Sequence, residues 1–307
     1  MEALYIHTSH QLEKIRLGST SSGKLLDLHE VKTASFWRAV VAEFLATALF
    51  VFLSLLSAMR VSDSEFPATG NDWYVKISLT FGLAIMAMIQ MVGHVSGGHI
   101  NPAVSLSMAV NMNISIIRCV FYILAQCSGA TVGGAVVKAV TSSYNIDRNS
   151  GIAVTNLADD VTQAQGLVVE VLLTFVLVVV IYGTTDPSRA TFGNPSVAIG
   201  LTVGLAHLAG IQYTGCGINP ARSLGSAVAS EKWDNHWIYW VGPLFGGVLA
   251  GLVYKFVLNP YRGVMDIEEA IKMLSDEESS NKHTTNTAIG GVSRAASAKK
   301  LASVKPA

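Results

Sequence analysis

Six long apolar runs, separated by polar or glycine-rich segments, dominate the hydropathy pattern of the chain. Each is about twenty residues long, the length that an α-helix needs to cross the hydrocarbon core of a bilayer. The pattern therefore predicts an all-α membrane protein with six transmembrane helices. The predicted spans are residues 36–59, 74–93, 114–141, 164–183, 195–211 and 236–258.

Two further apolar runs, residues 104–110 and 223–229, are too short to cross a bilayer. Each follows an Asn-Pro-Ala triplet. Asparagine is a favoured helix N-cap, and proline fits the first helical turn because its missing N–H would have no intrahelical partner there. Each triplet therefore predicts the start of a half-helix. The triplets are Asn101-Pro102-Ala103 and Asn219-Pro220-Ala221.

The chain repeats one plan twice, over residues 36–141 and 164–258. Glu43 lies early in the first span as Glu170 lies early in the fourth, so the repeat extends beyond the triplets. Because each half has an odd number of spans, the second half enters the membrane from the opposite side and the repeat is inverted. The two half-helices are then re-entrant from opposite faces and meet at the midplane, which indicates a transport site.

Composition agrees with a protein embedded in the lipid bilayer. Hydrophobic residues make up 50% of the chain, charged residues 14%, and the mean hydropathy is +0.44. The formal net charge of zero gives no reason to expect nucleic acid as a partner, and three cysteines predict no disulfide framework. Glu43 and Glu170 are accompanied by no nucleophile or set of metal ligands, so we expect no enzyme, cofactor or metal.

Polar segments flank the membrane domain, which we place at residues 36–260. Residues 1–35 lack the apolar core of a signal peptide and are expected to form an N-terminal arm. Residues 261–307 form a C-terminal tail, with apolar residues at helical spacing over 265–278 that predict a short amphipathic helix. Six spans put both ends on one side, and the basic residues of the two tails make that side cytoplasmic.

Two serines of the tail, Ser297 and Ser303, each follow a basic residue by three positions. Kinases that prefer basic substrates favour this spacing, so a kinase is a candidate partner. An unmodified polar tail explains the same residues equally well.

Two Asn-Pro-Ala triplets on opposed half-helices within a six-span inverted repeat resemble the aquaporin family, in particular its water-selective animal members. The likeness extends to residues 36–44, 93–99, 213–219 and 235–243. It implies the aquaporin fold and a passive, water-selective channel of the plasma membrane, driven by osmotic gradients. It also implies a homotetramer with one pore per subunit.

Asn101 and Asn219 are the predicted centre of the pore. Opposed half-helix N-termini place partial positive charge there, which opposes cations. The two side-chain amides would donate to the oxygen of a passing water, whose hydrogens then point along the file, so that it cannot relay a proton. The alternative, that both asparagines only cap their helices, stays open.

Arg222 follows the second triplet directly, and a cation this deep in a membrane is rare and usually functional. By resemblance it belongs to a selectivity filter with Phe81, His207 and Cys216. Arginine and histidine would donate hydrogen bonds and repel cations, while the two rings narrow the pore to about one water. Taken singly, Phe81 also fits core packing, His207 a satisfied interior histidine and Cys216 a small buried hydrophobe.

Residues at two positions indicate the size of the permeating molecule. Glycerol-conducting relatives usually have a small residue at the position of His207 and an aspartate at that of Ser223, so glycerol permeation is the weaker alternative. Cys216 beside the filter predicts inhibition by mercurials. By the same resemblance, Glu43 and Glu170 are buried acids that hold backbone N–H groups near the half-helices.

His94 is predicted at the cytoplasmic vestibule of the pore. Two other classes of function compete with a passive channel. An ion channel or coupled transporter should show further acids or unwound spans within the membrane. A junctional or structural protein of the same fold would not require an intact filter.

Overall fold

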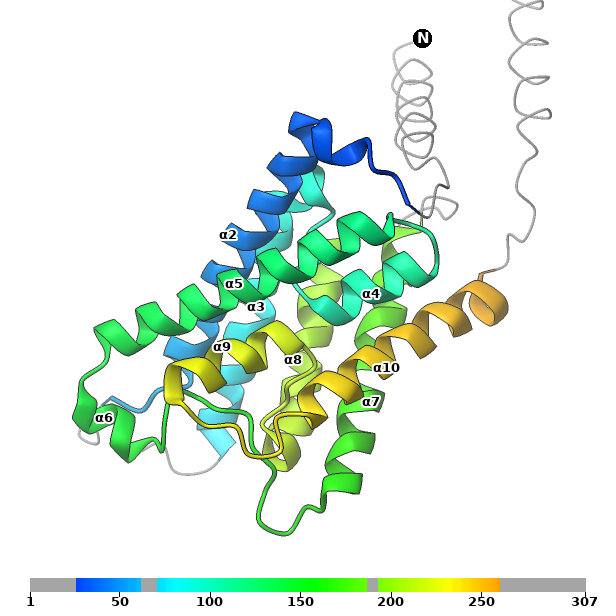
Figure 1. The fold of residues 1–307 in the computed structure, drawn as a ribbon. Helices are drawn as coiled ribbons and strands as arrows, with labels where there is room; N and C mark the ends of the chain where they lie inside the picture. Colours follow the sequence, from blue (N-terminus) through cyan, green and yellow to red (C-terminus); the bar gives the residue numbers. More distant parts are fainter. Residues whose placement is uncertain (1–25, 62–70, 187–192, 260–307) are drawn as a thin grey trace, which may run out of the picture. The chain divides into compact units, whose positions relative to one another are not determined.

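The computed structural model describes residues 26–61, 71–186 and 193–259, and the regular elements in this part of the chain are helical (Figure 1). Six helices are long and apolar enough to cross a membrane, which confirms the predicted class. These helices are α2 (Ala34–Ser57), α3 (Asn71–Ser96), α5 (Ile116–Val140), α7 (Gln163–Thr185), α8 (Pro195–Thr214) and α10 (Ile238–Val253), the last extended by a π-helical turn, η2 (Tyr254–Leu258).

The half-helices α4 (Pro102–Val110) and α9 (Pro220–Ser230) begin at the prolines of the two triplets, as predicted. Each packs mainly against a long helix of the other repeat, α4 on α10 and α9 on α5. Their N-terminal ends meet in the interior, because each capping asparagine is bonded to the loop that precedes the other half-helix. The inverted repeat with two re-entrant half-helices is therefore confirmed.

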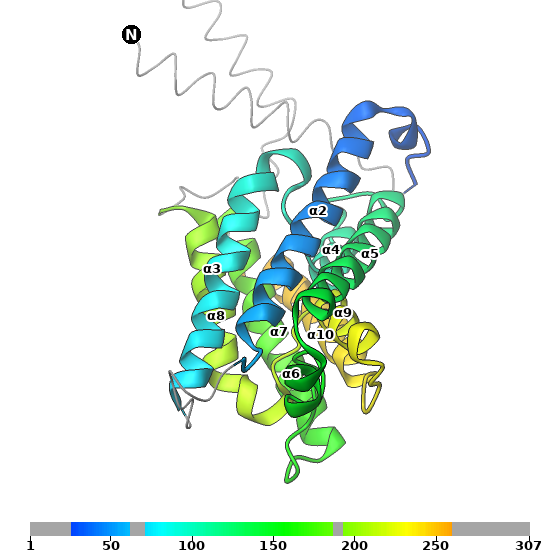
Figure 2. The ribbon, with the colours of Figure 1, turned by 90° about the vertical axis from the view of Figure 1, so that its left-hand side faces the viewer.

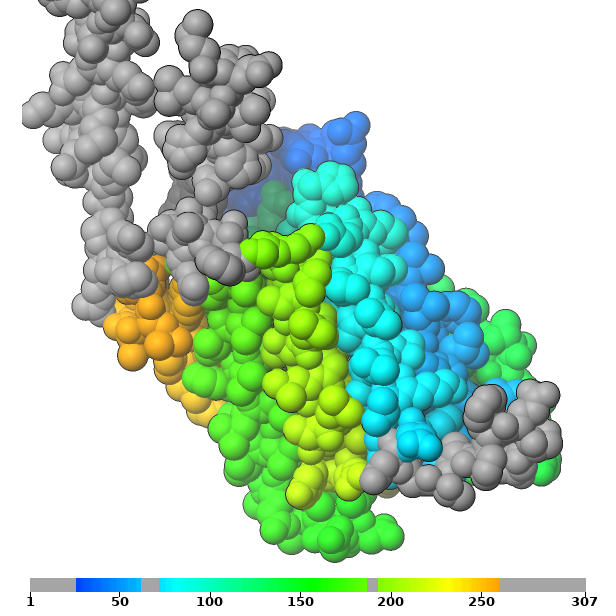
Figure 3. All heavy atoms as spheres, turned by 180° about the vertical axis from the view of Figure 1, so that it is seen from behind, coloured from blue at the N-terminus to red at the C-terminus, as the bar shows by residue number. Residues whose placement is uncertain are grey.

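The full-length helices pair in matching ways in the two halves. α2 packs on α5 and α7 on α10, while α3 and α8 meet across the boundary between the halves. Figure 2 and Figure 3 show α3 and α8 side by side, and Figure 3 shows α7 and α2 on either side of them.

Glycines bring the paired helices into backbone contact. A Cβ atom at Gly129 of α5 would collide with the carbonyl oxygen of Phe44 in α2. A Cβ atom at Gly246 of α10 would collide in the same way with the carbonyl oxygen of Val171 in α7. Phe44 follows Glu43 and Val171 follows Glu170, so the two contacts are equivalent in the repeat.

The structure corrects several predicted boundaries, most clearly at α3 and in the segment after α5. α3 extends beyond the predicted 74–93 at both ends, because polar residues such as Asp72 and His94 continue its backbone hydrogen bonding. The supposed loop 142–162 contains a short helix, α6 (Ser143–Arg148), capped by the side chain of Ser142, which accepts a bond from the Asn145 N–H. Six residues are too few for a hydrophobic period to show in the sequence.

The N-terminal arm is described from residue 26 onward and includes a 3₁₀ turn, η1 (Glu30–Lys32). The predicted helix at 265–278 and both tail serines, Ser297 and Ser303, lie outside the described residues. The predicted domain limits stay predictions.

Candidate functional site

Asn101 and Asn219 cap the half-helices with their side-chain oxygens. Oδ1 of Asn101 accepts the N–H of Ala103 at 2.9 Å, and Oδ1 of Asn219 accepts the N–H groups of Ala221 at 3.0 Å and Arg222 at 3.3 Å. Capping therefore uses the amide oxygen of each asparagine, and the amide nitrogen remains available as a hydrogen-bond donor.

The amide nitrogens form a reciprocal pair of bonds across the molecule. Nδ2 of Asn101 donates to the carbonyl oxygen of Ile218 at 2.9 Å, and Nδ2 of Asn219 donates to that of Ile100 at 2.9 Å. Both isoleucines have a left-handed backbone, with φ of 55° at Ile100 and 44° at Ile218, which is unusual for a β-branched residue and is a mark of functional sites. Since an amide NH₂ group has two hydrogens, each Asn keeps one for a ligand.

Glu43 holds the loop before α4 through hydrogen bonds to its carboxylate. Its Oε1 accepts the N–H of His99 at 2.9 Å and the hydroxyl of Ser96 at 2.6 Å, and its Oε2 accepts the N–H of Ile100 at 2.7 Å. Gln126 donates to the same Oε2 at 2.8 Å. The carboxylate is fully buried, and these donors satisfy it.

Glu170 does the same for the loop before α9. It accepts the hydroxyl of Thr214 at 2.6 Å and the N–H groups of Gly217 at 2.8 Å and Ile218 at 2.7 Å. The two acids therefore fix the two isoleucine carbonyls to which the asparagines donate.

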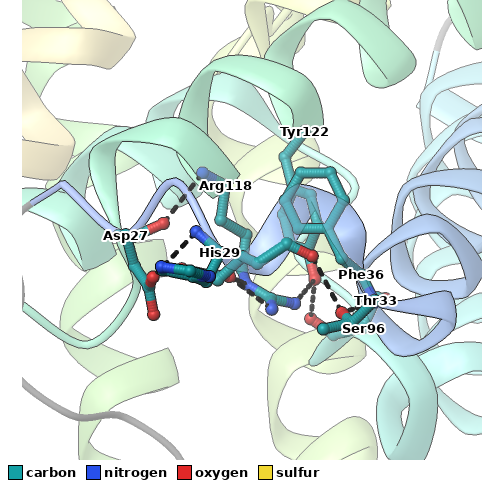
Figure 4. A network of polar contacts seen from close by, with 9 residues as sticks. Asp27, His29, Thr33, Phe36, Ser96, Arg118 and Tyr122 are labelled. Carbon is teal, nitrogen blue, oxygen red and sulfur yellow. Dashed lines mark hydrogen bonds and ion pairs between the residues drawn. The ribbon is translucent and has the colours of Figure 1, made fainter.

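A tyrosine braces each loop from the side. Tyr122 donates its hydroxyl to the carbonyl oxygen of Ser96 at 2.9 Å, as Tyr239 does to that of Thr214 at 2.8 Å. The first of these tyrosines also accepts a hydrogen bond from an arginine. Figure 4 shows Arg118 between Tyr122 and the N-terminal segment, where its guanidinium pairs with Glu30 of η1 at 2.5 Å.

A cavity of about 220 Å³ lies between the half-helices and the helices of both repeats. Its wall is largely apolar, so the few polar side chains on it are the groups available to a polar permeant. These side chains are His99, Asn101, Thr185, His207, Asn219 and Arg222.

Phe81, His207 and Arg222 lie together on this cavity, although they come from α3, α8 and α9. The ring centroids of Phe81 and His207 are 4.0 Å apart, and the guanidinium carbon of Arg222 lies 5.2 Å from the centroid of Phe81. All three side chains are buried. The structure thus brings three of the four predicted filter residues together on one cavity.

Arg222 is held by a segment that the sequence did not single out. Its Nη1 donates to the carbonyl oxygen of Ala153 at 3.0 Å and to the hydroxyl of Ser226 at 3.3 Å. The buried Nε has no hydrogen-bond partner among the described residues. A carbonyl in a connecting segment leaves no sequence signal, because every residue has one.

His207 was predicted to donate a hydrogen bond into the pore, and the structure indicates that it accepts one instead. Its Nδ1 lies 2.9 Å from the carbonyl oxygen of Val203, and because a carbonyl only accepts, Nδ1 must carry the hydrogen. Nε2 of the neutral ring is then an acceptor, and it too is buried without a partner in the described chain. On this part of the cavity wall, Arg222 therefore supplies hydrogen-bond donors and His207 an acceptor.

Two predicted site residues lie off the cavity wall. Cys216 is fully buried, and the wall beside it is formed by Gly217 and Ile218. His94 is exposed near the end of α3, whereas His99 lines the cavity. His99 could have been chosen from its place between the glycines and the first triplet. No group of three metal-binding side chains occurs among the described residues.

This fold and this site define a membrane channel, with a mostly apolar cavity between two half-helices. The family model described as "Major intrinsic protein" matches residues 30–254. The chain belongs to the major intrinsic protein family.

Curated relatives cover most of the chain. Aquaporin-1 of Homo sapiens is 47% identical over 249 residues, which is 80% of this chain and 90% of that protein. Aquaporin-1 of Mus musculus is 50% identical over 236 residues, 75% of this chain and 86% of that one. Aquaporin FA-CHIP of Pelophylax lessonae is 46% identical over 237 residues, with the same coverage.

A solved structure also matches. The aquaglyceroporin from Plasmodium falciparum has a TM-score of 0.64 and 26% identity, covering 73% of this chain and 98% of that one. The predicted aquaporin fold is confirmed.

Proposed function

We propose that the protein is a passive, water-selective channel driven by osmotic gradients. The observation that carries the proposal is the sparse set of polar atoms on one apolar cavity: two amide nitrogens at its centre and the Arg222 and His207 groups at its constriction. Water moves fast through a pore that offers few hydrogen bonds, because each molecule must also leave its sites easily. Identity of 44–50% to proteins named Aquaporin-1 supports the same function.

The asparagine pair is the proposed barrier to proton relay. Each Nδ2 keeps one hydrogen, so one water oxygen accepts from Asn101 and Asn219 together. The two hydrogens of that water then face its neighbours in the file, and it has no lone pair free to accept a proton from them. The N-terminal ends of α4 and α9 add partial positive charge, which opposes cations at the same point.

Phe81, His207 and Arg222 are the proposed selectivity filter. The guanidinium charge repels cations, and the bonds to Ala153 and Ser226 keep it in place beside the rings. Cys216 belongs to this filter by resemblance, with its backbone next to the wall. Glu43 and Glu170 act by holding the loops and have no catalytic part, and we assign no enzymatic activity to the chain.

Water is favoured over glycerol by two observations. Phe81 and His207 lie in contact on the cavity wall, with ring centroids 4.0 Å apart, so a bulky ring stands where glycerol-conducting relatives usually have a small residue. The match to a protein named aquaglyceroporin is at 26% identity, far below the 47% to Aquaporin-1 of Homo sapiens.

The cellular setting is proposed on the same grounds. Basic residues of the two tails favour a cytoplasmic position for both termini, in the plasma membrane. The family resemblance supports a homotetramer, and the base-to-serine spacing supports a kinase acting at Ser297 and Ser303.

Reconstitution of the full-length protein into liposomes tests this function. Stopped-flow light scattering after an osmotic step in sucrose should show fast shrinkage, with an activation energy close to that of free water diffusion. A step in glycerol should give the same shrinkage without fast re-swelling, and a pH-sensitive dye inside should report no proton leak. Shrinkage no faster than that of empty liposomes would refute the proposal.

A further inference from the structure

A buried hydrogen-bonded chain joins the far end of half-helix α4 to α7. Ser107 donates its hydroxyl to the carbonyl oxygen of Gly247 in α10 at 2.7 Å. Its one hydrogen is thereby used, so the Tyr182 hydroxyl, 3.2 Å away, must donate to Ser107. Asn111 in turn donates its Nδ2 to the Tyr182 oxygen at 2.8 Å. Every bond in the chain therefore has an assigned direction.

The chain continues to the end of α10. The rings of Tyr182 and Tyr254 are stacked, with centroids 5.4 Å apart and planes 19° apart. Tyr254 begins the π-helical turn η2 and donates its hydroxyl to Oδ2 of Asp186 at 2.8 Å. Asp186 is the C-cap of α7. Short π-helical segments within helices are rare and frequently lie at functional sites.

The inverted repeat provides an internal comparison for this cluster. A Cβ at Gly251 would collide with Asn111 and closely approach Ser107; a Cβ at its counterpart Gly134 would meet Gly225 and Ala229. Both crossings are therefore tight, the first against side chains of α4 and the second mainly against the backbone of α9. At the other crossing, however, the cluster members are replaced by apolar residues. The counterparts of Ser107, Asn111, Tyr182, Tyr254 and Asp186 are Gly225, Ala229, Leu55, Val137 and Met59.

This comparison separates packing from function. The five equivalent positions of the other crossing carry no side-chain hydrogen-bonding group of this kind, so the repeat can be built without the polar cluster. Burying hydroxyl and amide groups is unfavourable unless they are bonded, and even then the net gain is small. Directional bonds instead fix one arrangement of the helices that make them.

The helices so fixed are part of the pore wall. Ile181 precedes Tyr182 in α7 and lines the cavity, as does Thr185 one turn later. Met108, which follows Ser107 in α4, lines the cavity from the other side. A shift of Tyr182 relative to α4 would therefore change the bore at this end of the pore.

We propose that Tyr182, Tyr254 and Asp186 are positioning residues for the end of the pore beside η2, with the Tyr254–Asp186 bond as the link that ties the last turn of the membrane domain to the pore wall. The inference rests on the proposed function, water conduction.

Hydroxyl and carboxylate variants of the full-length protein test the link in liposomes. Tyr254→Phe and Asp186→Ala each remove the bond and keep the ring stack, and water permeability per channel should fall about threefold, the scale of one net hydrogen bond. Asp186→Asn keeps an acceptor and should retain most of the permeability. The double variant should lose clearly less than the two single losses combined, because both substitutions remove the same bond.

Tyr144→Phe is the matched control, since it removes an exposed hydroxyl on α6 away from the cavity. Its permeability should equal that of the wild type. The thermal midpoint in detergent is measured in parallel, because a merely structural role would lower stability and leave the permeability of each folded channel unchanged. That outcome, or additive losses in the double variant, would overturn the inference. A wild type that does not conduct water would instead refute the proposed function.

Discussion

Asn219 performs two separable tasks with the two ends of one side-chain amide. Its oxygen caps α9, and its nitrogen donates to the Ile100 carbonyl and keeps a hydrogen for a permeant. A substitution that keeps the oxygen and removes the nitrogen therefore isolates the second task. Aspartate is such a residue, and its negative charge is tolerated at a helix N-terminus.

Asn219→Asp should fold and yet conduct poorly. The cap persists, but a carboxylate oxygen replaces the donor and faces the Ile100 carbonyl, so we expect at least a tenfold lower water permeability per channel in stopped-flow measurements. Asn194→Asp is the control, because Asn194 also caps a helix ahead of a proline, with its Oδ1 3.0 Å from the Ser196 N–H, and is exposed. Equal conduction by the two variants would contradict the role of the amide nitrogen.

Mercurials should inhibit the channel slowly and through Cys216. The thiol is fully buried, so reagent reaches it only when the loop opens, and a bulky adduct would push Gly217 and Ile218 into the pore. Osmotic shrinkage should therefore decline over the incubation time, and Cys216→Ser should be resistant. Cys127→Ser, which changes a half-buried thiol of α5, should remain sensitive. Mercury without effect on the wild type would show that Cys216 is too far from the permeation path.

His236, just before α10, should make the stability of the protein depend on pH. Burial lowers the pKa of its ring below 6.5, and Nε2 accepts the indole N–H of Trp240 at 3.0 Å, which requires a neutral ring. The unfolded chain then binds more protons than the folded one between the lowered pKa and 6.5. Stability is fully present above that window and is lost as pH falls through it.

Thermal unfolding in detergent at pH 7.5 and at pH 5 measures this effect. His236→Gln keeps an acceptor near Trp240 without a titrating ring, so the drop in midpoint on acidification should be smaller in the variant than in the wild type. An equal drop in both proteins would assign the pH dependence to other groups.

At the scale of single residues, the sequence identified the important side chains, but it did not always indicate their roles. Both asparagines and Arg222 stood out through the duplicated triplets, and the structure brings Phe81 and His207 to the same cavity. It could not indicate that His207 accepts, because that follows from the position of the Val203 carbonyl one helical turn away. Nor could it indicate Ala153, which acts through its backbone alone.

Among the helices, the predictable features were those with a long period or a strong local signal. Runs of about twenty apolar residues identify spans, and Asn-Pro identifies the half-helix starts. The helix α6 and the π-helical turn η2 were not predicted. They have six and five residues, too few for a hydrophobic period that distinguishes a helix from a loop. Pairing of helices was also hidden, since it depends on which glycine faces which carbonyl.

Gly246→Ala should destabilise the α7–α10 pair. The new methyl group would collide with the Val171 carbonyl, and overpacking of this kind costs about 1–3 kcal/mol. The thermal midpoint in detergent should fall clearly below that of the wild type. Gly93→Ala is the control, since its Cβ would meet only a side-chain carbon of Ile89 at 3.7 Å. Equal midpoints for the two variants would mean that the helices separate at little cost.

At the scale of the whole molecule, the two halves share one arrangement of helices but differ in the side-chain contacts that support the half-helices. The Glu43 and Glu170 clusters are nearly equivalent, as are the tyrosines that brace each loop. Arg118 with Glu30, and Tyr182 with Tyr254 and Asp186, belong to the first half-helix alone within the described chain. The pore centre is thus nearly symmetric, while the contacts around it differ between the two ends.

Two reciprocal hydrogen bonds join the halves, from Asn101 to Ile218 and from Asn219 to Ile100. A two-fold symmetric interface has this form, because each side makes the same contact with the other. Two copies of a single half, inserted in opposite orientations, could form both bonds without any change of sequence at the contact. Joining two such copies into one chain would preserve the bonds and then free the ends to diverge. The present protein therefore has the geometry expected of a gene duplication whose ancestor worked as an antiparallel homodimer.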